Sequence, residues 1–207
     1  MFQEEAVLRE ILCEALNGKK IEQERISQVL RISIGLVNKT VSKLDQIGAV
    51  SKEGRSYLVI AFEKILTYWA SIHNLRRDLI YWTGVLEPVR EIERNLPGGV
   101  IFSAYTAFNH LFNEVPSDYS EVWLYVPPDL LPEVKERFPS NNLPVNLYVL
   151  KSDDLPRDNS RRYSGGRNIV SIPQLYADLW NIPTWYSKEY INSLESKLRE
   201  MKDGILE

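Results

Sequence analysis

The chain has 207 residues, enough for one large domain or for two small domains that each bury a core. Its composition, 44% apolar and 26% charged, is that of a globular protein, and no apolar run of about 18 residues is present to span a membrane. The formal net charge of −3 argues against a protein that coats nucleic acid without specificity, and the single cysteine, Cys13, excludes an intramolecular disulfide.

The first thirty residues predict two helices. Residues 4–16 carry apolar side chains at helical spacing and are followed by Gly18, and residues 22–30 repeat the pattern. The opening segment, MFQEEAVLREIL, is acidic where a signal peptide would be basic and then apolar. We therefore expect a cytoplasmic location.

Residues 33–47 predict a helix with two contrasting faces. Apolar residues recur at spacings of three and four, so we expect them to be buried; they are Ile34, Val37, Val41, Leu44 and Ile47. Short or cationic side chains occupy the opposite face, namely Gly35, Lys39, Ser42, Lys43 and Gln46. A helix that enters a groove of DNA needs such a face, because donors must reach phosphates and base edges while nothing bulky holds the backbone away.

Residues 49–60 predict a β-hairpin that follows Gly48, a residue that tolerates the left-handed conformation at a helix end. Two short apolar runs flank a polar turn with Gly54 at its tip and with Lys52 and Arg55 beside it. Helix, turn, helix and hairpin in this order resemble a winged helix-turn-helix domain.

Basic residues are concentrated in this region. From residue 31 to residue 56, five basic side chains face two acidic ones, a net charge of about +3. The residues that we expect to contact DNA are Ser33, Gly35, Asn38, Lys39, Ser42, Lys43, Gln46, Lys52, Arg55 and Ser56. Winged-helix domains also serve as protein-interaction modules, which is one alternative.

Residues 62–81 predict a long helix with a broad apolar stripe that runs from Phe62 to Leu79. We assign residues 61–84 to a linker helix between a DNA-binding domain at 1–60 and a second domain at 85–207. His73 is expected on the polar, solvated side of this helix.

The remaining residues alternate between predicted strands and helices. Strands are expected at residues 100–102, 121–126, 145–150 and 169–172. Helices are expected at residues 87–95, 104–112, 129–138, from 173 onward, and at 186–202. This alternation predicts an α/β domain, which makes the whole chain α+β.

The strand, small turn and helix around Ser103 have the layout of nucleotidyltransferase-type folds. Those enzymes need two carboxylates on one face of the next strand, because the carboxylates share divalent metals. Here Glu121 opens that strand, but Trp123 and Tyr125 occupy the alternating positions. We therefore expect a degenerate nucleotidyltransferase-type fold that is not an enzyme and uses no cofactor or metal. An active nucleotidyltransferase with a DNA-binding domain is the second alternative.

The same region resembles the C-terminal part of the type IV antitoxin family called AbiEi. The matching segments are VIFSAYTAFNHL, EVWLYV, VNLYVL and IVSIPQLYADLWN. The resemblance implies a winged helix joined to such a domain, in a DNA-binding autorepressor that acts beside a separate, nucleotidyltransferase-like toxin. Asp178 matches an acidic position of the family, and we expect it to make a structural hydrogen bond or salt bridge.

Residues 153–168 are polar and rich in arginine and glycine, which predicts a loop. Cations beside Tyr163 suit contact with a nucleic-acid backbone and a stacked base, and these cations are Arg157, Arg161, Arg162 and Arg167. A solvated surface loop is the alternative.

Together these features predict a transcriptional regulator of the antitoxin type. Its expected partners are double-stranded DNA, a second copy of the chain on an inverted repeat, and a nucleotidyltransferase-like toxin, with no membrane involved. Four or five phosphate contacts predict a slope of about −4 for log affinity against log salt per protomer.

Overall fold

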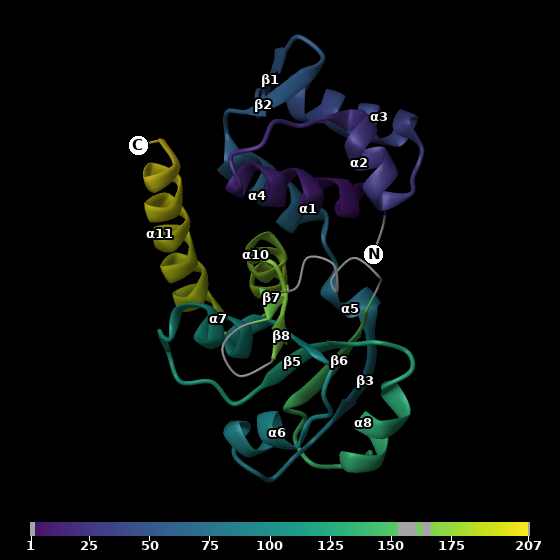
Figure 1. The fold of residues 1–207 in the computed structure, drawn as a ribbon. Helices are drawn as coiled ribbons and strands as arrows, with labels where there is room; N and C mark the ends of the chain where they lie inside the picture. Colours follow the sequence, from purple (N-terminus) through teal and green to yellow (C-terminus); the bar gives the residue numbers. More distant parts are fainter. Residues whose placement is uncertain (1–2, 153–160, 163–166, 207) are drawn as a thin grey trace. The chain divides into compact units, whose positions relative to one another are not determined.

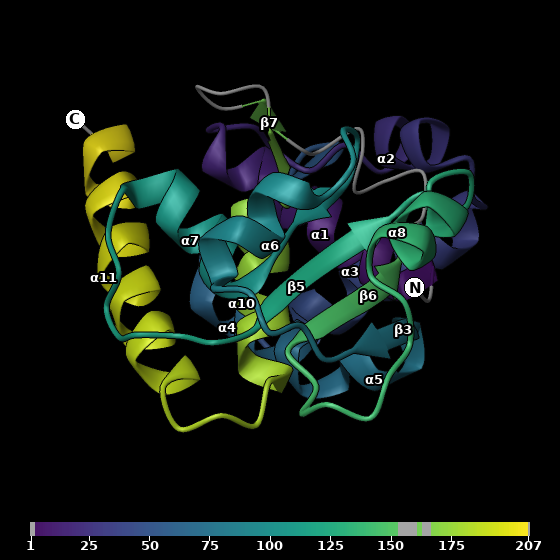
Figure 2. The same ribbon diagram turned by 90° about the horizontal axis from the view of Figure 1, so that it is seen from below.

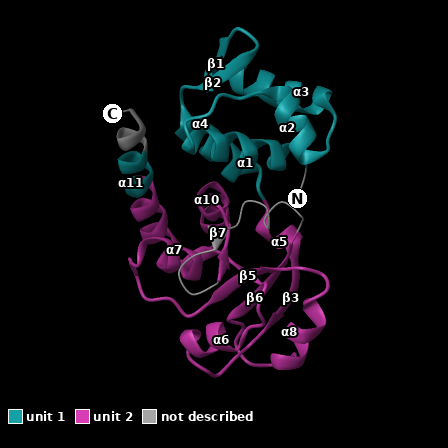
Figure 3. Cartoon of the chain, in the orientation of Figure 1, with its two compact units in different colours: residues 1–73, 196–207 teal, residues 74–195 magenta. Residues whose placement is uncertain are grey.

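The computed structural model describes residues 3–152, 161–162 and 167–206, and it shows an α+β protein with a helical N-terminal region and a C-terminal mixed sheet with helices (Figure 1). The chain divides into two compact units, coloured separately in Figure 3. Unit 1 comprises residues 1–73 and 196–207, and unit 2 comprises residues 74–195.

Unit 1 consists of four helices and a hairpin from the N-terminal part of the chain, together with the end of the last helix. The elements are α1 (Gln3–Leu16), α2 (Gln23–Leu30), α3 (Ile34–Gln46), β1 (Val50–Glu53), β2 (Ser56–Val59) and α4 (Phe62–Ile72). Helix α1 packs against α2, α3 and α4. The core between them is mainly aliphatic, and its buried residues include Leu8, Ile11, Leu12, Ile26, Val37, Val41, Leu44, Ile65 and Trp69.

The hairpin pairs along β2 with a third, very short extended segment. Strands β1 and β2 pair antiparallel from Val50↔Val59 to Glu53↔Ser56. Ile21, which precedes α2, exchanges two backbone hydrogen bonds with Tyr57 of β2, at 2.7 and 3.0 Å. The hairpin is therefore connected to the α2–α3 pair at two places: through Ile21, which precedes α2, and through the chain that leaves α3.

Two residues that were predicted to be buried are exposed. Ile34 and Ile47 have relative exposures of 42% and 43%, whereas the middle of the apolar face of α3 is buried as expected. Both lie at the ends of the buried stripe of α3, and Ile47 is already outside the helix with φ −85° and ψ 2°. Gly48 then takes a φ of 65°, so the predicted helix stop is confirmed.

The long helix predicted for residues 62–81 is wrong in its second half. Helix α4 ends at Ile72, and the chain continues as a short helix α5 (Leu75–Asp78) and a strand β3 (Leu79–Thr83). The segment Leu-Ile-Tyr-Trp-Thr is rich in aromatic and β-branched residues and pairs with a strand far along the chain, and this pairing outweighs the helical spacing. The boundary between the two units, between residues 73 and 74, falls inside the predicted linker helix.

Unit 2 is built on a six-stranded mixed sheet with the strand order β3-β6-β5-β4-β8-β7. Its other strands are β4 (Ile101–Phe102), β5 (Val122–Val126), β6 (Leu147–Lys151), β7 (Arg161–Arg162) and β8 (Asn168–Ile169). The β6–β5 and β4–β8 pairs are parallel, and the β3–β6, β5–β4 and β8–β7 pairs are antiparallel.

Helices cover both faces of this sheet. They are α6 (Val89–Asn95), α7 (Ala104–Phe112), α8 (Leu131–Arg137), α10 (Ile172–Asn181) and α11 (Ser187–Leu206), the last of which continues into unit 1. Figures 1 and 2 show α6 and α8 on one face and α10 on the other. The predicted strands and helices of this half are confirmed with shifts of a few residues at their ends, and α7 occupies the predicted range.

Two elements of unit 2 are absent from the prediction. Strand β3 lies at one edge of the sheet, and β7 lies at the other edge within the segment that was predicted to be all loop. Strand β3 pairs with β6, which is distant in the sequence, and β7 pairs with β8, which is only two residues long. The local sequence pattern therefore carries little signal for either strand. Throughout the described part of the chain, no helix has both the length and the apolar character needed to cross a bilayer.

Candidate nucleic-acid interface

The outward surface of α3 carries most of the residues predicted to contact DNA. Ser33 caps the helix, since its Oγ accepts a hydrogen bond of 3.3 Å from the backbone N–H of Leu36. The buried stripe described above turns the opposite side of the helix to solvent. The predicted residues that are exposed there are Gly35, Asn38, Lys39, Ser42 and Gln46.

Lys43 differs from the other predicted cations because it is bound within unit 1. Its Nζ lies 2.7 Å from Oε1 of Glu4 in α1, and the hydroxyl of Tyr68 in α4 donates to the same oxygen at 2.9 Å. The hydrogen bond with Glu4 raises the pKa of Lys43, so the amine stays charged while its charge is matched internally. Lys43 therefore joins α3 to α1 and α4 and is poorly placed as a phosphate ligand.

The hairpin presents two cations to solvent. Lys52 and Arg55 are exposed, and neither side chain makes an ion pair with any other residue that the structure describes. The neighbouring Glu53 pairs with Lys20 at 2.6 Å, so the hairpin acid is neutralised from outside the hairpin. Ser56 is half-buried and donates to the carbonyl of Glu53 at 3.1 Å.

A hollow of about 530 Å³ lies between the hairpin tip, the first two turns of α3 and the start of α2. We refer to it as the hairpin hollow, and its lining residues are Glu22, Gln23, Glu24, Ile34, Asn38, Arg55 and Ser56. It brings the tip of the hairpin beside the exposed side of α3. Sequence reasoning placed Asn38, Arg55 and Ser56 in one site, but it missed Ile34, which was assigned to the core.

Of the four arginines in the predicted loop, Arg157 lies outside the described residues. Arg161 and Arg162 form β7 in the backbone, but their side chains also lie outside the described part. Arg167 is described, and it turns inward: Nη1 lies 3.6 Å from Oε2 of Glu93 and 3.3 Å from Nε2 of His110. The prediction of a nucleic-acid contact is therefore not supported by the position of Arg167.

Arg167 belongs to a small, partly buried cluster of side chains. Glu93 also accepts a hydrogen bond of 2.8 Å from the hydroxyl of Thr106, and the guanidinium of Arg167 lies 5.4 Å from the ring centroid of Phe102. Burial lowers the pKa of His110, while the charge of Glu93 opposes this shift. The cluster fixes β8 to α6 and α7.

The turn after β4, where a nucleotidyltransferase-type site was considered, is filled by a buried hydrogen-bond network. The hydroxyl of Ser103 donates to Asp178 at 2.5 Å, and the hydroxyl of Tyr125 and the amide of Gln174 also donate to Asp178, at 2.9 and 2.8 Å. Asp178 is fully buried, at 0% exposure. The structural hydrogen bond predicted for Asp178 is confirmed, and the turn presents no open hydroxyl to a ligand.

Glu121, the acid expected near this turn, is engaged by a neighbouring indole. Glu121 accepts a hydrogen bond of 3.0 Å from the indole of Trp123, and burial raises the pKa of its carboxyl group. Within the residues that the structure describes, no group of three or more His, Cys, Asp or Glu side chains is placed to hold a metal ion.

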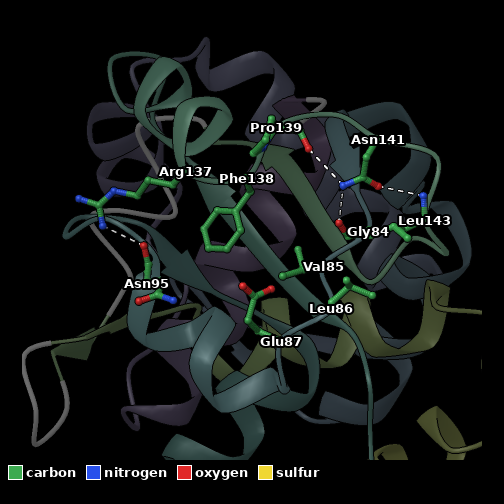
Figure 4. A pocket seen from close by; sticks show the side chains of 10 residues that line it. All are labelled: Gly84, Val85, Leu86, Glu87, Asn95, Arg137, Phe138, Pro139, Asn141 and Leu143. Atoms are coloured by element: carbon green, nitrogen blue, oxygen red, sulfur yellow. Dashed lines mark hydrogen bonds between the residues drawn. The ribbon is translucent and has the colours of Figure 1, made fainter.

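Unit 2 also has a cavity of about 490 Å³ between the end of β3, α8 and the loop that follows α8 (Figure 4). Two of its polar groups are used internally: Arg137 donates to the carbonyl of Asn95 at 2.8 Å, and Asn141 donates to the carbonyl of Gly84 at 2.7 Å. A Cβ at Gly84 would lie 2.5 Å from the Cβ of Leu143, so close packing requires glycine there. Sequence reasoning did not find this cavity.

The comparisons with known proteins do not add to this geometry. A scan against protein-family models, a search of curated proteins and a search of solved structures each found no match to the chain.

Proposed function

We propose that the protein is a transcriptional regulator that binds double-stranded DNA through α3 and the β1–β2 hairpin of unit 1. The proposed fold of this unit is a winged helix-turn-helix, in which α2 and α3 form the helical pair and the hairpin forms the wing. The proposed role is that of an antitoxin-type autorepressor, which rests on the sequence resemblance described above.

The observation that carries the DNA-binding proposal is the hairpin hollow. It shows that Arg55 and Ser56 at the hairpin tip share one surface with Asn38 of α3. A duplex that lies on this surface meets donors from two elements at once, a helix for the major groove and a hairpin for the adjacent backbone. The short Ile21 segment supports the winged-helix assignment, because it adds a third extended chain to the hairpin.

Three cations are available for phosphates on this surface: Lys39, Lys52 and Arg55. Because Lys43 is paired with Glu4, the expected number of phosphate contacts falls below the four or five inferred from sequence. Three contacts give a slope of about −3 for log affinity against log salt for one protomer on duplex DNA. Such a protomer binds weakly alone, which favours two copies on an inverted repeat.

The test measures binding of a fluorescent duplex by anisotropy from low to physiological salt. The variant Lys39→Ala, Lys52→Ala, Arg55→Ala should lose almost all affinity and almost all salt dependence. A matched control with the same change of charge, Arg90→Ala, Lys151→Ala, Lys188→Ala, removes three exposed cations of unit 2 and should leave both quantities unchanged. Equal losses in the two variants, or no duplex binding by the natural protein at low salt, would refute the proposal.

Unit 2 is proposed to provide the surface for a second copy or for a cognate nucleotidyltransferase-like toxin. In the autorepressor role, the protein should bind the DNA upstream of its own gene. A reporter under that DNA tests this role: added protein should repress the reporter, and the triple variant of unit 1 should not.

A further inference from the structure

We propose that Ile34 and Asn38 read base edges in the major groove, Ile34 through a thymine methyl group and Asn38 through an adenine. The preferred DNA would then carry A·T pairs at neighbouring positions of each half-site. This inference rests on the proposed function and specifies which part of α3 selects sequence.

Ile34 is a large aliphatic side chain in the first turn of α3, and it contributes little to the core. Its relative exposure is 42%, although the pattern of the helix predicted burial. It lines the hairpin hollow instead. In a major groove, the C5 methyl group of thymine is the apolar feature, so an exposed aliphatic side chain of this kind is matched to thymine.

Asn38 lies one turn further along α3 and lines the same hollow. It is exposed, and its amide makes no hydrogen bond to any other described side chain or backbone group. An amide carries a donor and an acceptor side by side, which matches N7 and the N6 amino group of adenine. The other exposed polar residues of α3 carry a single hydroxyl or a charge, except for Gln46 near the opposite end of the helix.

The charge of the hollow favours bases over phosphates. Glu22 and Glu24 form part of its lining together with Arg55, and their carboxylates repel a phosphate. Base edges carry no net charge, so they can enter beside these acids. The cations Lys39 and Lys52 are not part of the lining, and they are left for the backbone.

The spacing of the two side chains fits adjacent reading positions. Residues four apart on a helix have Cβ atoms about 5–6 Å apart. Base pairs rise by about 3.4 Å along the duplex. Ile34 and Asn38 therefore reach base pairs that are one or two steps apart.

The experiment first selects duplexes from a random library with the full-length protein. The selected site should contain adenine and thymine one or two steps apart. Two analogues then test the contacts in that site: 7-deazaadenine removes the N7 acceptor, and deoxyuridine in place of thymidine removes the methyl group.

For the natural protein, 7-deazaadenine should lower the affinity by about fivefold or more, and loss of the methyl group should lower it by about fourfold. In Asn38→Ala the adenine analogue should have no effect, and in Ile34→Ala the uracil substitution should have none. Matched controls at exposed positions, Asn142→Ala and Ile60→Ala, should respond as the natural protein does. Thermal unfolding of each variant verifies that it folds.

The outcomes separate the two proposals. If the natural protein binds duplex DNA with the expected salt dependence but tolerates both analogues, the reading roles of Ile34 and Asn38 are refuted and the proposed function stands. If the analogue effects persist in the Asn38 and Ile34 variants, other residues read these bases and the inference is equally refuted. If no duplex binds, both proposals fail.

Discussion

Gly35 occupies a helical position where glycine has no structural reason within the chain. Its φ is not in the left-handed region, and a Cβ built there meets no atom within 4 Å. Glycine in the interior of a helix costs up to about 1 kcal/mol relative to alanine, and Gly35 lies in the first turn of α3. A glycine that lowers helix stability on the exposed face of α3, with no structural reason within the chain, is consistent with close approach of a DNA backbone to this face.

Gly35→Ala should therefore separate stability from binding. We expect the free energy of unfolding to rise by up to about 1 kcal/mol, because alanine restricts the unfolded chain and favours the helix. We expect duplex affinity to fall severalfold, because the added methyl group stands between helix and DNA. Chemical denaturation and anisotropy measure the two effects.

Gly98→Ala is the matched control, since its Cβ would also meet open space but in unit 2. It should leave duplex affinity at the natural value. An unchanged affinity for Gly35→Ala as well would show that the outer line of α3 does not approach DNA closely.

At the scale of elements, a buried polar cluster joins α1 to the end of α4. Oε2 of Glu5 lies 2.6 Å from Nδ1 of His73 and accepts a hydrogen bond of 3.3 Å from the indole of Trp69. Both Glu5 and His73 are almost completely buried, whereas His73 was predicted to lie in solvent. The prediction was wrong because the partner of His73 lies 68 residues away in the sequence, and helical spacing reports nothing about it.

Glu5→Ala should lower the free energy of unfolding by about 3 kcal/mol, because two buried groups lose their shared acceptor. Glu5→Gln should lose less, since its amide oxygen can still accept from Trp69. Urea denaturation measures both variants against Glu87→Ala, an exposed acid whose removal should change stability by less than about 0.5 kcal/mol. A Glu5→Ala protein that unfolds at the natural midpoint would contradict the role given to this cluster.

Elements with strong local patterns were predictable from the sequence, and elements made by distant pairing were not. Helix α7 was predicted over its full range, because the sequence pattern that indicates a helix is local. Strand β3 was predicted as helix, since its identity depends on β6, which follows more than sixty residues later. The same division holds for the candidate site: exposure of Lys39 and Arg55 was predictable, whereas the pairing of Lys43 with Glu4 was not.

At the scale of the whole molecule, the number of cations available for phosphates bears on how many protomers bind one duplex. The three proposed cations are Lys39, Lys52 and Arg55. Three phosphate contacts support weak binding, so we expect two protomers on a duplex that carries an inverted repeat and one on a half-site. Sedimentation velocity with a labelled duplex measures both ratios. A single protomer on the full repeat, at protein concentrations that saturate the DNA, would contradict this expectation.

The backbone bridge between Ile21 and Tyr57 has a consequence for the geometry of any operator. The second strand of the hairpin is bonded to Ile21 close to the turn, which restrains the hairpin, so the span between the backbones at Arg55 and Lys39 is nearly constant. Unit 1 then contacts DNA at two points, one on α3 and one on the hairpin, whose separation is fixed. Inserting one base pair between the two contacted stretches of DNA should therefore remove either the contact with α3 or the contact with the hairpin. The hairpin cannot shift to restore the lost contact.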